Sequence, residues 1–118
     1  MTMTQAYQSE TSGQANVVRQ IKTGEPLKIL AADEELAHLT KALSHPVRVA
    51  IVRHLLQLGE CVCTDLSEVV PVAHSTAMQH IKVLKEADLL CSTQQGRNVF
   101  YCVNPTVLTQ LKNLVNAL

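Results

Sequence analysis

Four cysteines are the most reactive side chains of this sequence, and two of them stand one residue apart. Cys61 and Cys63 flank Val62, while Cys91 and Cys102 lie farther along the chain. Thiolates bind soft ions such as As(III), Sb(III), Cd(II), Zn(II) and Cu(I), and they are the form of cysteine that oxidants attack. A free cysteine also serves as a small buried hydrophobic residue. Three alternatives therefore stay open: a soft-metal or metalloid site, a redox site and an inert place in the core.

A second set of polar side chains gathers on one predicted helix, about residues 74–87, and on the hairpin after it. The first turns of the helix present His74, Ser75, Thr76 and Gln79 on the side opposite its apolar stripe. Glutamine can pair with adenine through two hydrogen bonds, and Ser or Thr can bond to either type of base. His80 and Lys82 are placed for phosphates. Gln95 and Arg97, at the hairpin tip, fit the DNA backbone or the minor groove. The alternative is a polar face that simply meets solvent.

The elements that must position these groups follow from apolar periodicity and from residues that start or stop helices. We predict helices over 33–43 and 46–58, a short strand over 60–63, a short helix over 64–70, the helix over 74–87, a hairpin over 89–93 and 99–103, and a last helix from residue 105. Ser44 is the predicted cap of the second helix, Gly59 its stop, and Pro71 the end of the short helix. This order predicts a mainly α fold with a small β-hairpin wing (α+β), a winged helix-turn-helix.

Apolar stripes mark the faces that three of these helices are expected to bury. The helix over 46–58 has Val47, Ala50, Ile51, His54, Leu55 and Leu58 on its inner face, and the helix over 74–87 has Ala77, Ile81 and Leu84. The last helix carries Val107, Leu108, Leu111, Leu114, Val115 and Leu118. Because a chain of 118 residues buries a modest part of its surface, this last stripe predicts a homodimer. Packing within one subunit is the alternative.

The hairpin also predicts where the cysteines meet. If residues 95 and 96 form a two-residue turn, position i pairs with 191 − i, so Cys91 lies opposite Phe100 and Cys102 opposite Leu89. The two cysteines are then diagonal neighbours, about 7–8 Å apart. A short strand beside the last strand of the wing would bring one cysteine of the Cys-x-Cys pair near Cys102. These placements predict a cluster of three or four thiols.

Length and composition indicate one domain, with a polar arm over 1–24 and the folded part over 25–118. The net charge is zero, but residues 69–118 hold four Lys or Arg against two Asp or Glu, so a DNA-binding face must be local to this half. No signal peptide and no membrane-length apolar run is visible. We therefore expect a cytoplasmic protein without membrane contact, whose cysteines are kept reduced.

Three segments resemble the ArsR/SmtB family of repressors, in one register from about residue 33 to 118. Residues 42–52 (ALSHPVRVAIV) resemble its opening signature, 74–90 (HSTAMQHIKVLKEADLL) its recognition helix, and 95–101 (QGRNVFY) its wing. The resemblance implies a homodimer joined by its first and last helices, which releases operator DNA when a metal, metalloid or oxidant reaches a thiol or histidine site. Two departures are Met78, where the family often has Ser, and Asp88, where it often has Gly.

The sensor sites known in that family can be compared one by one. Residues 105–118 contain no His, Asp, Glu or Cys, so the zinc site on the last helix is excluded. No cysteine precedes Cys61, and neither the second nor the last helix contains one, so two further patterns fail. The Cys61–Cys63 pair resembles the Cys-x-Cys of arsenic-sensing members, except that Thr64 intervenes before the acidic residue.

From the sequence we predict a DNA-binding transcriptional repressor of double-stranded operator DNA, relieved by a thiol-reactive signal at the cysteines. No resident cofactor is required, and we expect no enzyme, because no Ser/His/Asp set or phosphate-binding loop is visible. Two alternatives remain. One is a thiol redox enzyme that uses Cys61 and Cys63. The other is a helix-turn-helix module for protein contacts without DNA binding.

Overall fold

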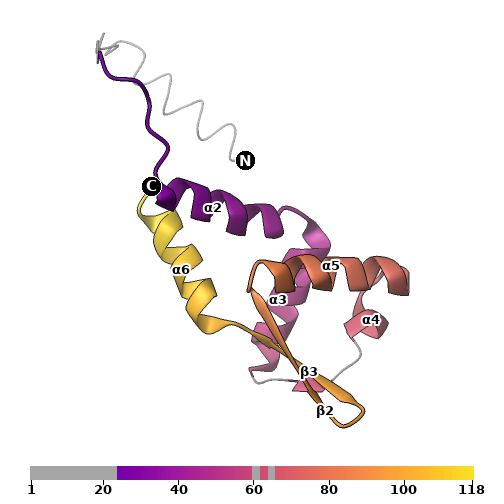
Figure 1. Ribbon diagram of the computed structural model, residues 1–118. Helices are drawn as coiled ribbons and strands as arrows, with labels where there is room; N and C mark the ends of the chain where they lie inside the picture. Colours follow the sequence, from indigo (N-terminus) through magenta and orange to yellow (C-terminus); the bar gives the residue numbers. More distant parts are fainter. Residues whose placement is uncertain (1–23, 60–61, 64–65) are drawn as a thin grey trace, which may run out of the picture.

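The structure, a computed structural model, describes residues 24–59, 62–63 and 66–118, and at 62, 63 and 67 only the backbone. Its elements are α2 (Ala31–Ala42), α3 (Pro46–Leu58), β1 (Val62–Cys63), α4 (Leu66–Val69), α5 (His74–Glu86), β2 (Leu90–Gln95), β3 (Asn98–Val103) and α6 (Pro105–Asn116). Figure 1 shows the hairpin of β2 and β3 extending from a body of helices. The predicted order and the winged helix-turn-helix fold are confirmed. The predicted arm falls almost wholly outside the described residues.

The start of α3 differs from the sequence prediction, because His45 and not Ser44 is the cap. The backbone amide of Val47 donates to Nδ1 of His45 at 3.1 Å, and Pro46 occupies the first turn. The Ser44 hydroxyl instead donates back to the carbonyl of Lys41 at 2.7 Å, at the end of α2. The other end of α3 is as predicted, since Gly59 takes a left-handed φ of 77°.

The three strands form one antiparallel sheet in the order β1-β3-β2, so the short strand lies beside the last strand of the wing as predicted. The predicted hairpin register is wrong by one position on each strand. Gln95 pairs with Asn98, which leaves Gly96 and Arg97 as the two-residue loop. Gly96 has a φ of 63°, which suits the first loop position of a type II′ turn. As a consequence Cys91 pairs directly with Cys102, not with Phe100.

The core lies between α3, α5 and the sheet, and α5 supplies its most deeply buried stripe. Ala77, Ile81 and Leu84 are at most 1% exposed, as predicted. The predicted inner face of α3 needs two corrections. Val52 is buried although it was not assigned to that face, and Leu58 is 48% exposed because the last turn of α3 passes beyond the core.

The step from α5 into the wing is a sharp turn at Asp88. This residue has a φ of 59°, a left-handed conformation that an L-residue adopts at a cost and that glycine adopts freely. Its amide donates to the carbonyl of Lys85, and the amide of Leu89 donates to the carbonyl of Leu84, both at 3.0 Å. The turn therefore keeps its sharpness without glycine and directs the buried Leu89 into the core.

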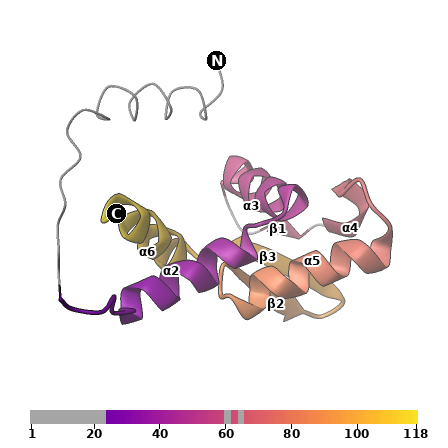
Figure 2. The same cartoon turned by 90° about the horizontal axis from the view of Figure 1, so that it is seen from above.

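At the opposite end of the molecule α2 and α6 lie side by side (Figures 1 and 2). Nε2 of Gln110 on α6 donates to Oε1 of Glu35 on α2 at 3.3 Å. Much of the apolar surface here is uncovered in a single chain. Leu111 is the one residue of α6 that is fully buried. The exposed aliphatic residues at this end are Leu27, Ile29, Leu30, Val115 and Leu118.

Candidate nucleic-acid interface

The outer face of α5 is the strongest candidate for a binding surface. Every residue predicted to read bases is exposed there: His74, Ser75, Thr76 and Gln79. Met78, also on this helix, is 40% exposed. The helix is capped by Ala73, whose methyl group makes no capping hydrogen bond, so the amides of the first turn can receive an anion. A rigid helix thus presents hydrogen-bonding side chains over an apolar inner face.

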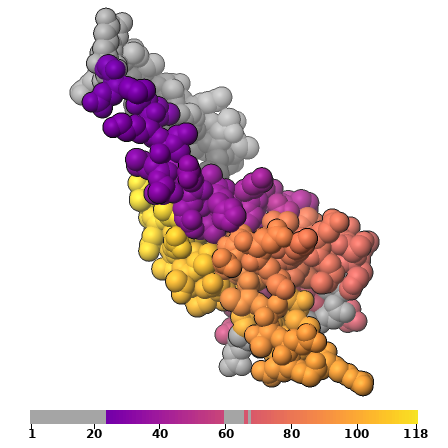
Figure 3. All heavy atoms as spheres, in the orientation of Figure 1, coloured from indigo at the N-terminus to yellow at the C-terminus, as the bar shows by residue number. Residues whose placement is uncertain are grey.

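The wing provides the second polar surface, and Figure 3 shows it protruding from the helical body. Gln95 and Arg97 are both exposed at its tip. The side-chain amide of Gln94 donates to the carbonyl of Gly96 at 3.4 Å, which helps to shape the loop. Arg97 occupies the loop itself and not the first position of the second strand, as the predicted register implied.

Lys82, predicted to contact phosphate, is exposed and lies 3.9 Å from Oε1 of Glu86 in a pair four residues apart on α5. Both side chains are solvated, so the ion pair is weak. Lys82 can therefore exchange this partner for a phosphate at little cost, and its predicted role is compatible with its position.

His80 has surroundings that the sequence reasoning missed. It is half-buried, its Nδ1 lies 3.2 Å from Nη1 of Arg48, and its ring centroid is 4.3 Å from that of His45. Burial, and then the neighbouring His45 and Arg48, lower the pKa of His80 below its usual 6.5. His80 is thus held neutral, although its phosphate contact stays a prediction. The signal that could have revealed Arg48 is its spacing of three residues from His45, which places both on one side of a helix.

The structure describes the side chains of two of the four cysteines, Cys91 and Cys102. Cys91 is exposed and carries a free thiol, whereas Cys102 is disulfide-bonded to a residue other than Cys91. The expectation that all the cysteines are reduced is therefore wrong at Cys102. Cys61 and the side chain of Cys63 lie outside the described residues. Among the residues that the structure describes, no group of three or more His, Cys, Asp or Glu is placed to hold a metal ion.

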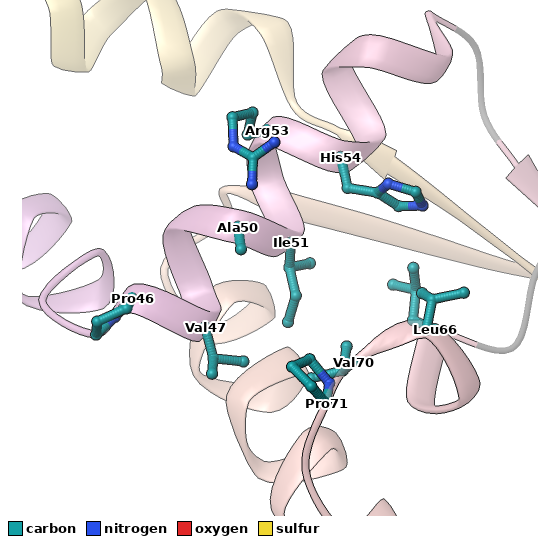
Figure 4. A pocket seen from close by; sticks show the side chains of 10 residues that line it. Pro46, Val47, Ala50, Ile51, Arg53, His54, Leu66, Val70 and Pro71 are labelled. Atoms are coloured by element: carbon teal, nitrogen blue, oxygen red, sulfur yellow. The ribbon is translucent and has the colours of Figure 1, made fainter.

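An apolar hollow of about 440 Å³ lies between α3 on one side and α4 with the two residues that follow it on the other. Figure 4 shows Val47 and Ile51 of α3 facing Leu66, Val70 and Pro71 across it. Among the residues that the structure describes, those lining the hollow are mainly aliphatic, with Arg53 and His54 as its charged or titratable members.

Among the described helices, none is long and apolar enough to cross a membrane.

Residues 43–91 match the model of a helix-turn-helix domain family. A biofilm growth-associated repressor of Xylella fastidiosa is 32% identical over 79 residues, which cover 67% of this chain and 68% of the relative. The HTH-type transcriptional repressor SmtB of Mycobacterium tuberculosis is 38% identical over 76 residues, 64% of this chain. The chain spans about half the length of this second relative, 53%.

Among solved structures, the homodimeric winged helix-turn-helix DNA-binding domain of a possible ArsR-family regulator from Mycobacterium bovis matches with a TM-score of 0.59. The match covers 81% of this chain and 88% of that domain at 21% sequence identity. At this identity the likeness concerns the fold, and it includes both the helix-turn-helix and the wing.

Proposed function

The chain belongs to the ArsR/SmtB family of winged helix-turn-helix transcriptional repressors, and from this membership we propose that it represses transcription by binding operator DNA as a homodimer. The family consists of transcriptional regulators, so the proposed activity is binding and not catalysis. The observation that carries the proposal is α5, whose outer face is polar and exposed over a fully buried inner stripe. Because a repressor must reach the chromosome, the proposal places the protein in the cytoplasm.

Base contacts fall to the first two turns of α5, which in this architecture enter the major groove. Thr76 and Gln79 are three residues apart and exposed, so both can face the same groove. Gln79 can bond to the N6 and N7 atoms of adenine. Lys82 and Arg97 supply the phosphate contacts that fix orientation without reading sequence.

Dimerisation is proposed through α2 and α6. The aliphatic side chains at this end are too exposed for a chain that acts alone, and Leu118 is 91% exposed. A two-fold axis there would cover this surface on both copies and would present α5 twice, at half-sites about 34 Å apart. The M. bovis domain of the same fold is homodimeric, which supports this arrangement.

The test is a fluorescence-anisotropy titration with the duplex upstream of the gene for this chain. We expect saturable binding that weakens as salt is raised, because phosphate contacts release counterions. Replacing both Thr76 and Gln79 by Ala should weaken specific binding at least about tenfold, since a good bidentate base contact is worth about 1–3 kcal/mol. Gln57→Ala, at an exposed position near the end of α3, is the matched control. Equal binding by the double variant and this control would contradict the proposal.

We further propose that a thiol-reactive signal relieves repression at the cysteines of the wing sheet. Cys91 and Cys102 are paired residues of an antiparallel ladder, in which Cα atoms lie about 4.5–5.5 Å apart. Because Cys102 is disulfide-bonded to a residue other than Cys91, the exposed thiol of Cys91 lies beside an existing disulfide. The disulfide already present at Cys102 favours an oxidant over the soft ions As(III), Sb(III), Cd(II), Zn(II) and Cu(I). Two thiols and one peroxide would give one disulfide and two waters.

This second proposal is tested by titrating the reduced protein with peroxide, and separately with As(III), Cd(II) and Zn(II), while operator binding is monitored. Peroxide should lower the affinity of the parent protein and leave Cys102→Ser unaffected. If operator binding responds to As(III) but not to peroxide, the oxidant is ruled out and the inducer is a soft ion. Full operator affinity after every treatment would remove the wing cysteines from regulation.

A further inference from the structure

Arg48 lies at the junction of three helices and contacts all of them. It belongs to the first turn of α3 and is half-buried. Its Nε donates to the carbonyl of Ala42 at 2.6 Å, and its Nη2 lies 3.3 Å from the carbonyl of Lys41. These two carbonyls end α2, where the helix itself offers no further donors. On its other side Nη1 faces His80, in the middle of α5.

The direction of the hydrogen bond between Arg48 and His80 follows from the chemistry of the two groups. A guanidinium has five N–H donors and no acceptor. Nδ1 of His80, 3.2 Å from Nη1, must therefore be the unprotonated ring nitrogen that accepts. The proton of the neutral ring is then on Nε2. The low pKa of His80 agrees with this assignment, because a protonated ring would turn a donor toward Arg48.

We propose that Arg48 is a positioning residue that sets the recognition helix α5 against the dimerisation helix α2. This inference rests on the function proposed above for both helices. His80 adjoins Gln79 and lies one turn after Thr76, so the contact that holds His80 also fixes the rotation of the two base-reading side chains. The planar fork of Arg bonds to α2 and α5 at once. A change at the α2–α6 end therefore reaches α5 through one side chain.

The first test compares Arg48→Met and Arg48→Lys with Arg53→Met, which changes an exposed arginine of the same helix. Arg48→Met should remain dimeric and lose about tenfold in operator affinity, a typical magnitude for coupling between sites. Arg48→Lys should fail to restore binding, since one ammonium lacks the fork. Arg53→Met should bind like the parent protein. A folded, dimeric Arg48→Met with parental affinity would overturn the inference.

The second test follows pH. The charged or titratable groups that face His80 are Arg48 of α3 and His45, the cap of that helix, and Lys41 of α2 contributes its backbone carbonyl to the same guanidinium. Operator affinity should fall when the pH drops through the pKa of His80, because protonation removes the acceptor. His80→Asn keeps an acceptor at the position of Nδ1 and should bind without that pH step. His80→Leu should bind as weakly as Arg48→Met. A parental pH step in His80→Asn would contradict the inference.

A measurement without DNA separates this inference from the proposed function. Long-range ¹H–¹⁵N spectra of the histidine rings should show His80 as the Nε2–H tautomer in the parent protein. Arg48→Met should lose this preference and shift the amides of α5 and of the end of α2. An Nδ1–H tautomer in the parent protein would overturn the inference even if operator binding is found. If no DNA is bound but the tautomer is as expected, the proposed function fails and the link between the helices stands.

Discussion

Helices α5 and α6 are close in length and both are amphipathic, yet a single chain buries them to different degrees. The inner stripe of α5 is complete, since Ala77, Ile81 and Leu84 are at most 1% exposed. On α6 only Leu111 is buried, while Val115 is 48% exposed and Leu118, just after the helix, is 91% exposed. A helix whose apolar face is satisfied can offer its polar face to a polar ligand. A helix whose apolar face is unsatisfied needs a further apolar surface. This difference supports the proposal that α5 binds DNA and that α6 binds a second copy of the chain.

The largest effect on stability is expected from a substitution in the buried stripe of α5. Leu84→Ala removes a fully buried side chain from α5 and should lower the free energy of unfolding by about 3 kcal/mol. Chemical denaturation followed by circular dichroism measures this cost. It should be the same at every protein concentration, because the contacts lie within one chain. A cost below about 1 kcal/mol would mean that α5 is not anchored as described.

The incomplete stripe should respond differently. Leu114 is half-buried on α6, and Leu114→Glu should weaken dimerisation about 100-fold, the magnitude of an interface hot spot. Sedimentation velocity measures the dimer equilibrium, and operator affinity should fall with it. Thr109→Glu, at an exposed position on the opposite side of α6, is the control. A dimer that survives Leu114→Glu and is lost in Thr109→Glu would place the interface on another face.

The helices could be predicted from the sequence because their signals are local. The stripe of α5 repeats at helical spacing, and Gly59 stops α3 where expected. The hairpin register could not be predicted, because residues 95–97 fit two different turns, with Gly96 in either the second or the first loop position, and only the strand pairing separates them. The Arg48–His80 contact was also missed, since it joins residues 32 positions apart. No periodicity reports a contact that depends on how two helices pack.

A smaller effect is expected where α5 meets the wing. Asp88→Gly should raise the free energy of unfolding by less than about 1 kcal/mol, because glycine adopts the left-handed φ of 59° without strain. Asp88→Asn removes the same charge, but Asn adopts this left-handed conformation less freely than glycine. The difference in stability between the two variants therefore measures the conformational cost at this position. Thermal denaturation measures both. A lower stability for the glycine variant than for the asparagine variant would contradict the conformational explanation.

The smallest effect concerns pH. Because the pKa of His80 in the folded chain is below 6.5, the unfolded chain takes up this proton first. The stability of the fold should therefore fall as the pH drops below about 6.5 and should stop falling below the pKa of the folded state. Denaturation of the parent protein and of His80→Asn across this range isolates the contribution. A parent protein that gains stability relative to His80→Asn on acidification would reverse the assigned direction.

The central claim is that two copies of α5, held by a dimer, read one operator. Hydroxyl-radical footprinting on the upstream duplex, combined with the stoichiometry of the complex, tests it most directly. We predict two chains per duplex and two protected segments about 34 Å apart, one helical turn, both lost together in the Thr76→Ala, Gln79→Ala double variant. A single chain per duplex, or protection that the double variant leaves unchanged, would contradict the claim.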